Sequence, residues 1–192
     1  MAHPIKICFQ NHKWWFISIL YMALTETPIC NFGENAKEFS LLSTDNKTLS
    51  LNNFRGEKGT LIMFICNHCP YVKKVIDKIV ADTNHLSKIG IKSVAVMSND
   101  TKNYPEDSFD NMINFSKKNK FSFPYLFDKT QEVAKNYGAV CTPDFFGYNN
   151  KLELQYRGRV EGLRKAMEQI ADSGNGPQKQ IPSMGCNIKW FK

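Results

Sequence analysis

The sequence predicts a single domain of the α/β class, in which β-strands alternate with α-helices. Two continuous apolar runs of strand length, residues 60–65 and 91–99, have the composition of strands that are buried on both faces. Between them, apolar residues recur at helical spacing after Pro70. A strand, helix and strand in this order form a right-handed crossover in nearly all proteins. The length of 192 residues, of which 42% are hydrophobic, supports one full-sized core.

Residues 1–21 are interpreted as a leader or an extra N-terminal extension. They carry Lys6 and Lys13 and then the run "WWFISILYMAL", an order typical of a secretory signal, but "TETPIC" supplies no small-x-small cleavage site. The run is too short to span a bilayer, and we expect no stable membrane span. We favour Met22 as the biological start and a cytoplasmic protein, with export or membrane anchoring as the alternative. A chain starting at Met22 is expected to fold and react normally.

The first structured element is predicted to be an N-terminal β-hairpin. The turn pair Asp45-Asn46 separates two short segments with apolar residues, 38–42 and 47–54. In the second segment, leucines alternate with polar neighbours, as in a half-buried strand. We therefore expect two antiparallel strands before the central strand.

The remaining elements continue the alternation of strands and helices. Gly90 ends the first helix, Ser108 and Thr130 can cap the next two, and Asn149-Asn150 separates the strands of a second hairpin. The predicted order is a strand at 60–65, a helix at 70–89, a strand at 91–99, a helix beginning at Ser108, a strand at 123–128, a helix at 131–138, strands at 144–148 and 152–158, and a helix built on Leu163, Ala166, Met167 and Ile170.

The domain is predicted to cover residues 22–176, followed by an irregular tail at residues 177–192. Glycine and proline at positions 174, 176 and 177 mark the boundary between them. The tail is too apolar and aromatic to remain free in water, so we expect it to dock on the domain. Its apolar residues are Ile181, Met184, Ile188, Trp190 and Phe191.

Charge and cysteine content narrow the class of function. The net charge of +7 comes from scattered lysines without arginine clusters or an interleaved aromatic platform, so we expect no nucleic-acid partner. Of the six cysteines, Cys66 and Cys69 are the close pair, which excludes the dense disulfide framework of a small secreted domain. A lone Cys-x-x-Cys in a chain of this length indicates redox or metal chemistry.

The predicted start of a helix at this motif favours redox chemistry. A helix N-terminus carries about half a positive charge and lowers the pKa of a cysteine there, and Pro70 is well suited to the first helical turn. Cys66, at the end of the strand, can then form a disulfide bond with Cys69. His68 between them can tune the pair, and we assign Cys66, Cys69 and His68 as catalytic residues. We expect no cofactor and no resident metal.

A metal-binding or structural thiol site is the alternative outside enzymology. Zinc requires four ligands in a structural site, and the chain offers one close cysteine pair together with scattered candidates. Those candidates are Cys141, Cys186 and His85.

Four segments in order resemble one known family. They are "FICNHCPYV", "NDTKNYPEDS", "FPYLFDKTQEVAKNYGAVCTPDFF" and "PSMGCNIKW". They are similar to the peroxiredoxin-like (AhpC/TSA-type, redoxin) branch of the thioredoxin superfamily, bacterial proteins usually called thioredoxin family proteins. The resemblance covers residue 22 to the end. It implies a thioredoxin-like fold with a central mixed β-sheet and helices on both faces.

The segment "GAVCTPDFF" supports this resemblance. Thr142-Pro143 stands directly before a strand, where a cis peptide bond is one way to turn the chain, and we predict that this bond is cis and lies close to the cysteine pair. In a thioredoxin-like architecture this loop packs beside the Cys-x-x-Cys motif, and backbone groups of Thr142 would pair with an extended substrate. We assign Thr142, Pro143, Asn67 and Pro70 to substrate binding.

The resulting hypothesis is a thiol-disulfide oxidoreductase that acts on disulfide-bearing or thiol proteins or small thiols, with a thioredoxin-type reducing system. The alternative is a thiol peroxidase, an antioxidant enzyme with Cys69 as peroxidatic cysteine. Cys69-Pro70 matches the peroxidatic pair of peroxiredoxins, but Cys66 occupies the position of their threonine, and their arginine has no counterpart at the level of motifs. The resemblance leaves open which cysteine attacks first. Cys186 and Cys141 are possible accessory thiols, and the oligomeric state is open.

Overall fold

The centre of the fold is a pair of parallel strands, β4 (Gly59–Phe64) and β5 (Ile91–Met97). Every residue of β4 is buried, and successive side chains point to opposite faces of the sheet. Leu61 and Met63 join the apolar core on one face, whereas Ile62 and Phe64 join the core on the other. The computed structural model describes residues 24–192, so the leader predicted at 1–21 and the start at Met22 lie outside the described residues.

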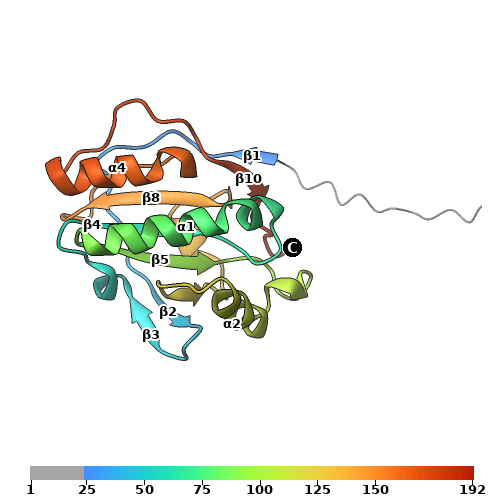
Figure 1. The fold of residues 1–192 in the computed structure, drawn as a ribbon. Helices are drawn as coiled ribbons and strands as arrows, with labels where there is room; N and C mark the ends of the chain where they lie inside the picture. The colour runs from blue at the N-terminus through green and yellow to red at the C-terminus, as the bar shows by residue number, and fades with distance from the viewer. Residues whose placement is uncertain (1–23) are drawn as a thin grey trace, which may run out of the picture.

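Seven strands form the main sheet, in the order β3-β2-β6-β5-β4-β8-β9 (Figure 1). β5 and β6 are parallel, like β4 and β5, whereas β2 and β3 pair antiparallel, as do β4 with β8 and β8 with β9. The predicted α/β class with a mixed sheet is therefore confirmed. The other strands are β2 (Ser40–Ser43), β3 (Thr48–Ser50), β6 (Tyr125–Phe127), β8 (Asp144–Asn149) and β9 (Leu154–Tyr156).

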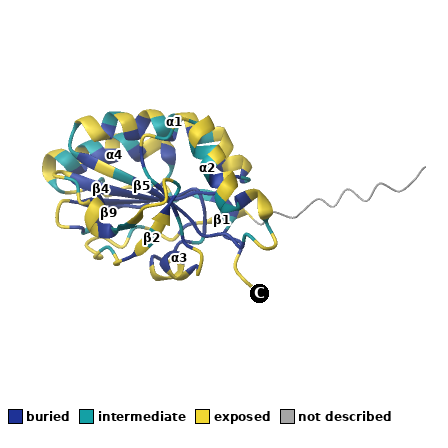
Figure 2. Ribbon diagram, turned by 90° about the horizontal axis from the view of Figure 1, so that it is seen from below, coloured by how far each residue is buried: buried dark blue, intermediate teal, exposed yellow. Residues whose placement is uncertain are grey.

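Helices cover both faces of the sheet. Figure 2 shows α1 (Pro70–Lys88), α2 (Phe109–Lys118) and α4 (Val160–Ser173) on one side and the short α3 (Glu132–Asn136) on the other. The apolar residues of α1 and α4 recur at helical spacing and join the core formed by Leu61 and Met63. α1 ends at Lys88, Ile89 is its C-cap residue, and Gly90 follows with φ +84°, a left-handed conformation that glycine adopts without steric strain.

Several predicted boundaries differ from the structure; the strands predicted at 152–158 and 91–99, for example, are shorter, and two further differences have a clear local cause. Residues 51–54 form a 3₁₀ helix, η1 (Leu51–Phe54), because the Asn53 side chain accepts the Ser50 amide at 2.8 Å and draws the chain out of the strand. The N-cap position of α3 belongs to Gln131, with φ +65°, and Thr130 lies one residue earlier, where its hydroxyl accepts the Glu132 amide at 3.4 Å. The Gln131 side-chain amide donates to the buried backbone carbonyls of Ser98 and Lys189, each at 2.7 Å. These two hydrogen bonds fix the position of the turn before α3.

A second, three-stranded sheet joins the two ends of the described chain. It has the order β1-β10-β7, with β1 (Leu24–Glu26), β10 (Met184–Asn187) and β7 (Cys141–Thr142), and all pairings are antiparallel. β1 and β10 lie side by side near the C-terminus in Figure 1. The tail therefore pairs with the domain through its backbone. No helix among residues 24–192 is long and apolar enough to cross a membrane.

Candidate active site

The cysteine pair lies where β4 gives way to α1. Cys66 comes two residues after the end of β4, and Cys69 is the N-cap residue of α1, with Pro70 in the first turn. The two cysteine side chains are buried, and Pro70 is exposed at the surface. The helix N-terminus thus faces Cys69, as the proline and the apolar spacing predicted.

The Thr142-Pro143 loop packs against both thiols. The Thr142-Pro143 peptide bond is cis, as predicted. The Cys66 sulfur lies 3.4 Å from the Thr142 hydroxyl, and the Cys69 sulfur lies 3.2 Å from the Thr142 carbonyl oxygen. Residues more than seventy positions apart in the sequence therefore form one site.

A third thiol, which the sequence left as a possible accessory, reaches the same place. The sulfur of Cys186 on β10 lies 2.8 Å from the sulfur of Cys69. Cys186 stands opposite Thr142 in the β7–β10 pairing. The edge of Thr142 that we expected to receive an extended substrate is therefore occupied by the protein's own tail. Cys141 instead donates to the Pro143 carbonyl at 3.7 Å.

The surroundings make Cys69 the most acidic of these thiols. Hydrogen bonds from the thiols of Cys186 and Cys66 lower the pKa of Cys69 below its ordinary value, against the effect of burial, and the Val72 amide in the first turn of α1 lowers it further. Burial, the hydrogen bond to Cys69 and the negative charge of Asp107 raise the pKa of Cys66. The hydrogen bond to Cys69, together with burial, raises the pKa of Cys186. The site therefore favours a thiolate at Cys69 flanked by two protonated thiols.

His68 contacts Cys66 and an acid that sequence reasoning missed. Its Nδ1 lies 2.6 Å from Oδ2 of Asp107 and 3.9 Å from the Cys66 sulfur. Asp107 ends the 3₁₀ helix η2 (Pro105–Asp107) and is fully buried. Its carboxylate also accepts the backbone amides of Asn67 and His68 at 2.7 and 3.2 Å and the Asn99 side chain at 2.7 Å. Asp107 thus positions the whole Cys-x-x-Cys loop.

Asn67, predicted to bind substrate, is held at both ends of its side-chain amide. Its Nδ2 donates to the Glu106 carbonyl at 3.1 Å, and its Oδ1 accepts the Tyr125 hydroxyl at 3.0 Å. The residue therefore anchors the loop, and a contact with substrate stays a prediction. A contact between Pro70 and substrate likewise stays a prediction.

Cys66, His68 and Asp107 also form a potential metal-binding group, because one ligand atom of each lies within 4.8 Å of the others. Asp107, however, already accepts two hydrogen bonds on each carboxylate oxygen. A metal ion would have to displace these donors. His85, a scattered ligand candidate, pairs with Glu168 at 2.7 Å instead. The geometry favours a hydrogen-bonded triad over an open chelate.

Two surface pockets border the site. One of about 580 Å³ is lined by Asn67, His68 and Lys73 together with residues of α2. The other, of about 280 Å³, is lined by Pro143 and Met184 with the exposed Tyr71. These hollows flank the buried sulfurs on the α2 side and on the β10 side.

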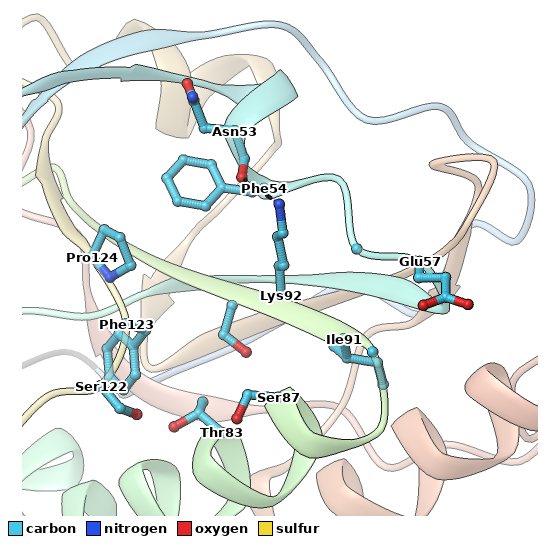
Figure 3. Close-up of a pocket in the computed structure, with 13 residues that line it drawn as sticks. Asn53, Phe54, Glu57, Thr83, Ser87, Ile91, Lys92, Ser122, Phe123 and Pro124 are labelled. Atoms are coloured by element: carbon cyan, nitrogen blue, oxygen red, sulfur yellow. Dashed lines mark hydrogen bonds between the residues drawn. The ribbon is translucent and has the colours of Figure 1, made fainter.

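A further pocket, of about 440 Å³, lies away from the cysteines. Figure 3 shows Asn53, Phe54, Thr83 and Lys92 around it. It includes Ile91, the first residue of β5, whereas the cysteines follow the opposite, C-terminal end of the parallel strand β4. None of its lining residues is a cysteine. This pocket therefore lies apart from the thiol site.

The fold and the thiol site define a redox protein with a thioredoxin-like fold. Residues 32–162 match the AhpC/TSA family, and the chain belongs to that family. A comparison with curated proteins finds no match.

Solved structures share the thioredoxin-like fold. An uncharacterized conserved protein from Geobacillus kaustophilus is 39% identical, with a TM-score of 0.85 over 88% of this chain and 97% of that one. A hypothetical protein from Sinorhizobium meliloti 1021 is 32% identical, with a TM-score of 0.84 over 87% and 98%. The thioredoxin domain of a thiol-disulfide oxidoreductase from Bacteroides vulgatus, 18% identical with a TM-score of 0.60 over 73% and 97%, shares the fold. The thioredoxin-like fold predicted from the motifs is confirmed.

Replacing Asp107 by asparagine is expected to weaken the loop. In the variant, the NH2 group of the new asparagine would lie against two other nitrogens, Nδ2 of Asn99 and Nδ1 of His68, and the hydrogen bonds that Asp107 Oδ2 accepts would be lost. We expect a loss of about 1–3 kcal/mol in the free energy of unfolding. Because the charge of Asp107 raises the pKa of Cys66, that pKa should fall in the variant. Urea denaturation and the pH dependence of Cys66 alkylation measure the two effects. Asp110→Asn, on the exposed surface of α2, is the control, and an equal response of both variants would contradict the assigned role.

Proposed function

We propose that the protein is a thiol-disulfide oxidoreductase in which Cys66 and Cys69 alternate between a dithiol and a disulfide. The observation that supports this most is the placement of Cys69 at the N-terminus of α1, between two further thiols and beside the Thr142-Pro143 loop. The proposed substrates are disulfides of proteins or small thiols. A thioredoxin-type system in the cytoplasm would return the pair to the dithiol.

The proposed reaction begins with the Cys69 thiolate. Its sulfur attacks one sulfur of the substrate disulfide, which forms a mixed disulfide and releases the other substrate sulfur as a thiolate that takes up a proton. The Cys66 thiol then loses its proton and attacks the Cys69 sulfur. The mixed disulfide breaks, a Cys66–Cys69 disulfide forms, and the second substrate thiol leaves. The substrate gains two electrons and two protons, and the protein loses them.

Peroxide reduction is the second candidate, because the chain belongs to the AhpC/TSA family. The positions of the arginines favour disulfide exchange over it. A peroxidase needs a cation that polarises the O–O bond beside the nucleophile, whereas each arginine of this chain is bound to another group, including Arg159, which lines the pocket beside Pro143. Arg55 binds Asn52, Arg157 binds Asp144, Arg159 binds the Pro182 carbonyl, and Arg164 binds Asp82.

Side-by-side assays of insulin reduction and hydrogen peroxide consumption test the proposal. Wild-type protein is expected to reduce insulin at a rate well above that of peroxide consumption, and Cys66→Ser is expected to reduce insulin more slowly than wild type, because the Cys66–Cys69 disulfide cannot form. Rapid peroxide turnover by Cys66→Ser, with Cys69 oxidised to sulfenic acid, would instead establish the peroxidase.

Metal titration tests the non-enzyme alternative. The thiols are first fully reduced, and zinc or copper(I) is then added to the wild type and to Cys66→Ser. Stoichiometric metal binding that requires both Cys66 and Cys69, together with no disulfide exchange, would overturn the oxidoreductase proposal.

A further inference from the structure

Strand β10 lies along the Thr142-Pro143 loop as an extended substrate would. It pairs antiparallel with β7, with Cys186 opposite Thr142. The Ser183 hydroxyl donates to the Pro143 carbonyl at 2.8 Å, which holds the start of β10 against the loop. A Cβ atom at Gly185 would overlap the Thr142 carbonyl oxygen, so glycine permits this close approach. The strand is thus fitted to the loop by backbone pairing and by shape.

This arrangement places three sulfurs around one helix N-terminus. The Cys186 sulfur lies 2.8 Å from that of Cys69, and both side chains are buried. A disulfide bond has an S–S distance of about 2.05 Å, so the two sulfurs need to approach by less than an ångström. All three cysteines of the site are free. Cys69 can therefore react with a partner on either side, Cys66 in its own loop or Cys186 on β10.

We propose that Cys186 is a third redox thiol, which attacks the mixed disulfide at Cys69 and forms a Cys69–Cys186 disulfide. This inference rests on the proposed function. It extends that function by assigning to β10 the role of an internal strand that presents a resolving thiol, Cys186, to Cys69.

The electrons balance with the substrate disulfide as the oxidant. After Cys69 has formed the mixed disulfide, the Cys186 thiol loses a proton and attacks the Cys69 sulfur. The bond between Cys69 and the substrate breaks, the Cys69–Cys186 bond forms, and the substrate sulfur leaves and takes up the proton. Cys66 can then attack Cys69 in the same way. That step forms Cys66–Cys69 and returns Cys186 to the thiol.

The test uses glutathione disulfide as the probe and the Cys66→Ser variant, in which the Cys66–Cys69 disulfide cannot form. Reduced protein is mixed with one equivalent of probe, quenched in acid at intervals, alkylated and mapped by mass spectrometry. We expect a Cys69–Cys186 disulfide and the release of two glutathione molecules per chain. In the variant with both Cys66→Ser and Cys186→Ser, the mixed disulfide at Cys69 should last at least about tenfold longer, because the neighbouring attacking thiol is gone. Cys66→Ser with Cys30→Ser is the matched control.

Persistent glutathionylation of Cys69 in Cys66→Ser, with Cys186 alkylated, would overturn the inference. The wild type gives a second measurement that needs no variant at Cys66, since early samples should contain Cys69–Cys186 before Cys66–Cys69 accumulates. If the wild type forms Cys66–Cys69 and never Cys69–Cys186, this inference alone fails. If glutathione disulfide and insulin both leave Cys69 unreacted, the proposed function fails and this inference with it.

Discussion

Replacing Cys69 by serine is expected to lower the rate of insulin reduction by at least about three orders of magnitude, as removal of a nucleophile does in other enzymes. A serine hydroxyl is not ionised near neutral pH and cannot form a disulfide. The variant loses the hydrogen bonds to Cys69 that raise the pKa of Cys186 and Cys66, but burial still raises both pKa values, so neither thiol should replace the lost thiolate. The measurement is the initial rate of insulin reduction with dithiothreitol as the reductant.

The control for this prediction is Cys30→Ser. Cys30 is half-buried and lies outside the site, with Arg157 and Gln180 as its neighbours, and burial raises its pKa to about 11. Its loss should leave the rate of insulin reduction unchanged. Cys66→Ser should fall between the two, because it still forms the mixed disulfide at Cys69, which Cys186 can resolve, but cannot form the Cys66–Cys69 disulfide. A Cys69→Ser variant that keeps a tenth or more of the wild-type rate would show that another thiol is the nucleophile.

The part of the site that sequence could predict depends on local signals. An apolar run, two cysteines, a proline and a helical repeat follow one another within thirty residues, and each constrains its neighbours directly. The position of Cys69 at the helix N-terminus therefore follows from residues beside it. Local signals did not suffice to assign the Thr142-Pro143 loop to the site; that prediction also required the resemblance to the thioredoxin-like architecture.

Asp107 could not be selected by such signals. The segment "NDTKNYPEDS" contains Asp100, Glu106 and Asp107 at short spacing, and nothing in the sequence separates them. The structure buries Asp107 and directs it to the Cys-x-x-Cys loop, whereas Glu106 stays exposed and Asp100 caps its own turn. Which of these three acidic residues reaches the site depends on how η2 packs against the Cys-x-x-Cys loop, forty residues earlier in the sequence.

β10 was missed as a strand for a related reason. The residues "MGCN" have little preference for the extended state, since glycine and asparagine are depleted in strands. Pairing with two short strands stabilises it, and Leu24 lies opposite Cys186 although more than 160 positions separate them. The sequence indicated a docked tail from its apolar residues. The register that brings Cys186 to Cys69 follows from backbone pairing and could not be predicted.

Replacing Arg157 by methionine is expected to destabilise the fold by about 3–5 kcal/mol, because it leaves a buried carboxylate without its partner. Arg157 donates to both oxygens of Asp144, at 2.9 and 3.4 Å, and to the Gly138 carbonyl at 2.7 Å. Its guanidinium group also lies 4.4 Å from the centre of the Phe146 ring. Asp144 follows Pro143 directly and begins β8, so this ion pair also supports the loop that contacts the thiols.

The loss of stability should depend on pH. Burial raises the pKa of Asp144 to about 6 although Arg157 lowers it, and an aspartate in an unfolded chain has a pKa of about 3.9. The folded state therefore binds more protons at this group, and its contribution to stability falls as the pH rises from about 4 to 6. Without Arg157 the pKa of Asp144 should rise further. The variant should then lose more stability at pH 8, where the folded state must keep an unpaired negative charge buried, than at pH 5, where the carboxyl is neutral.

Urea denaturation at pH 5 and pH 8 measures this difference. Arg164→Met is the matched control, because Asp82 keeps its ion pair with Lys78 at 2.7 Å after Arg164 is lost. Its effect should be smaller and nearly the same at both pH values. Adding Asp144→Asn to Arg157→Met should restore part of the stability at pH 8, since the uncompensated charge is gone. Equal losses for Arg157→Met at the two pH values, or no gain from the second substitution, would show that packing of the guanidinium group rather than its charge stabilises the start of β8.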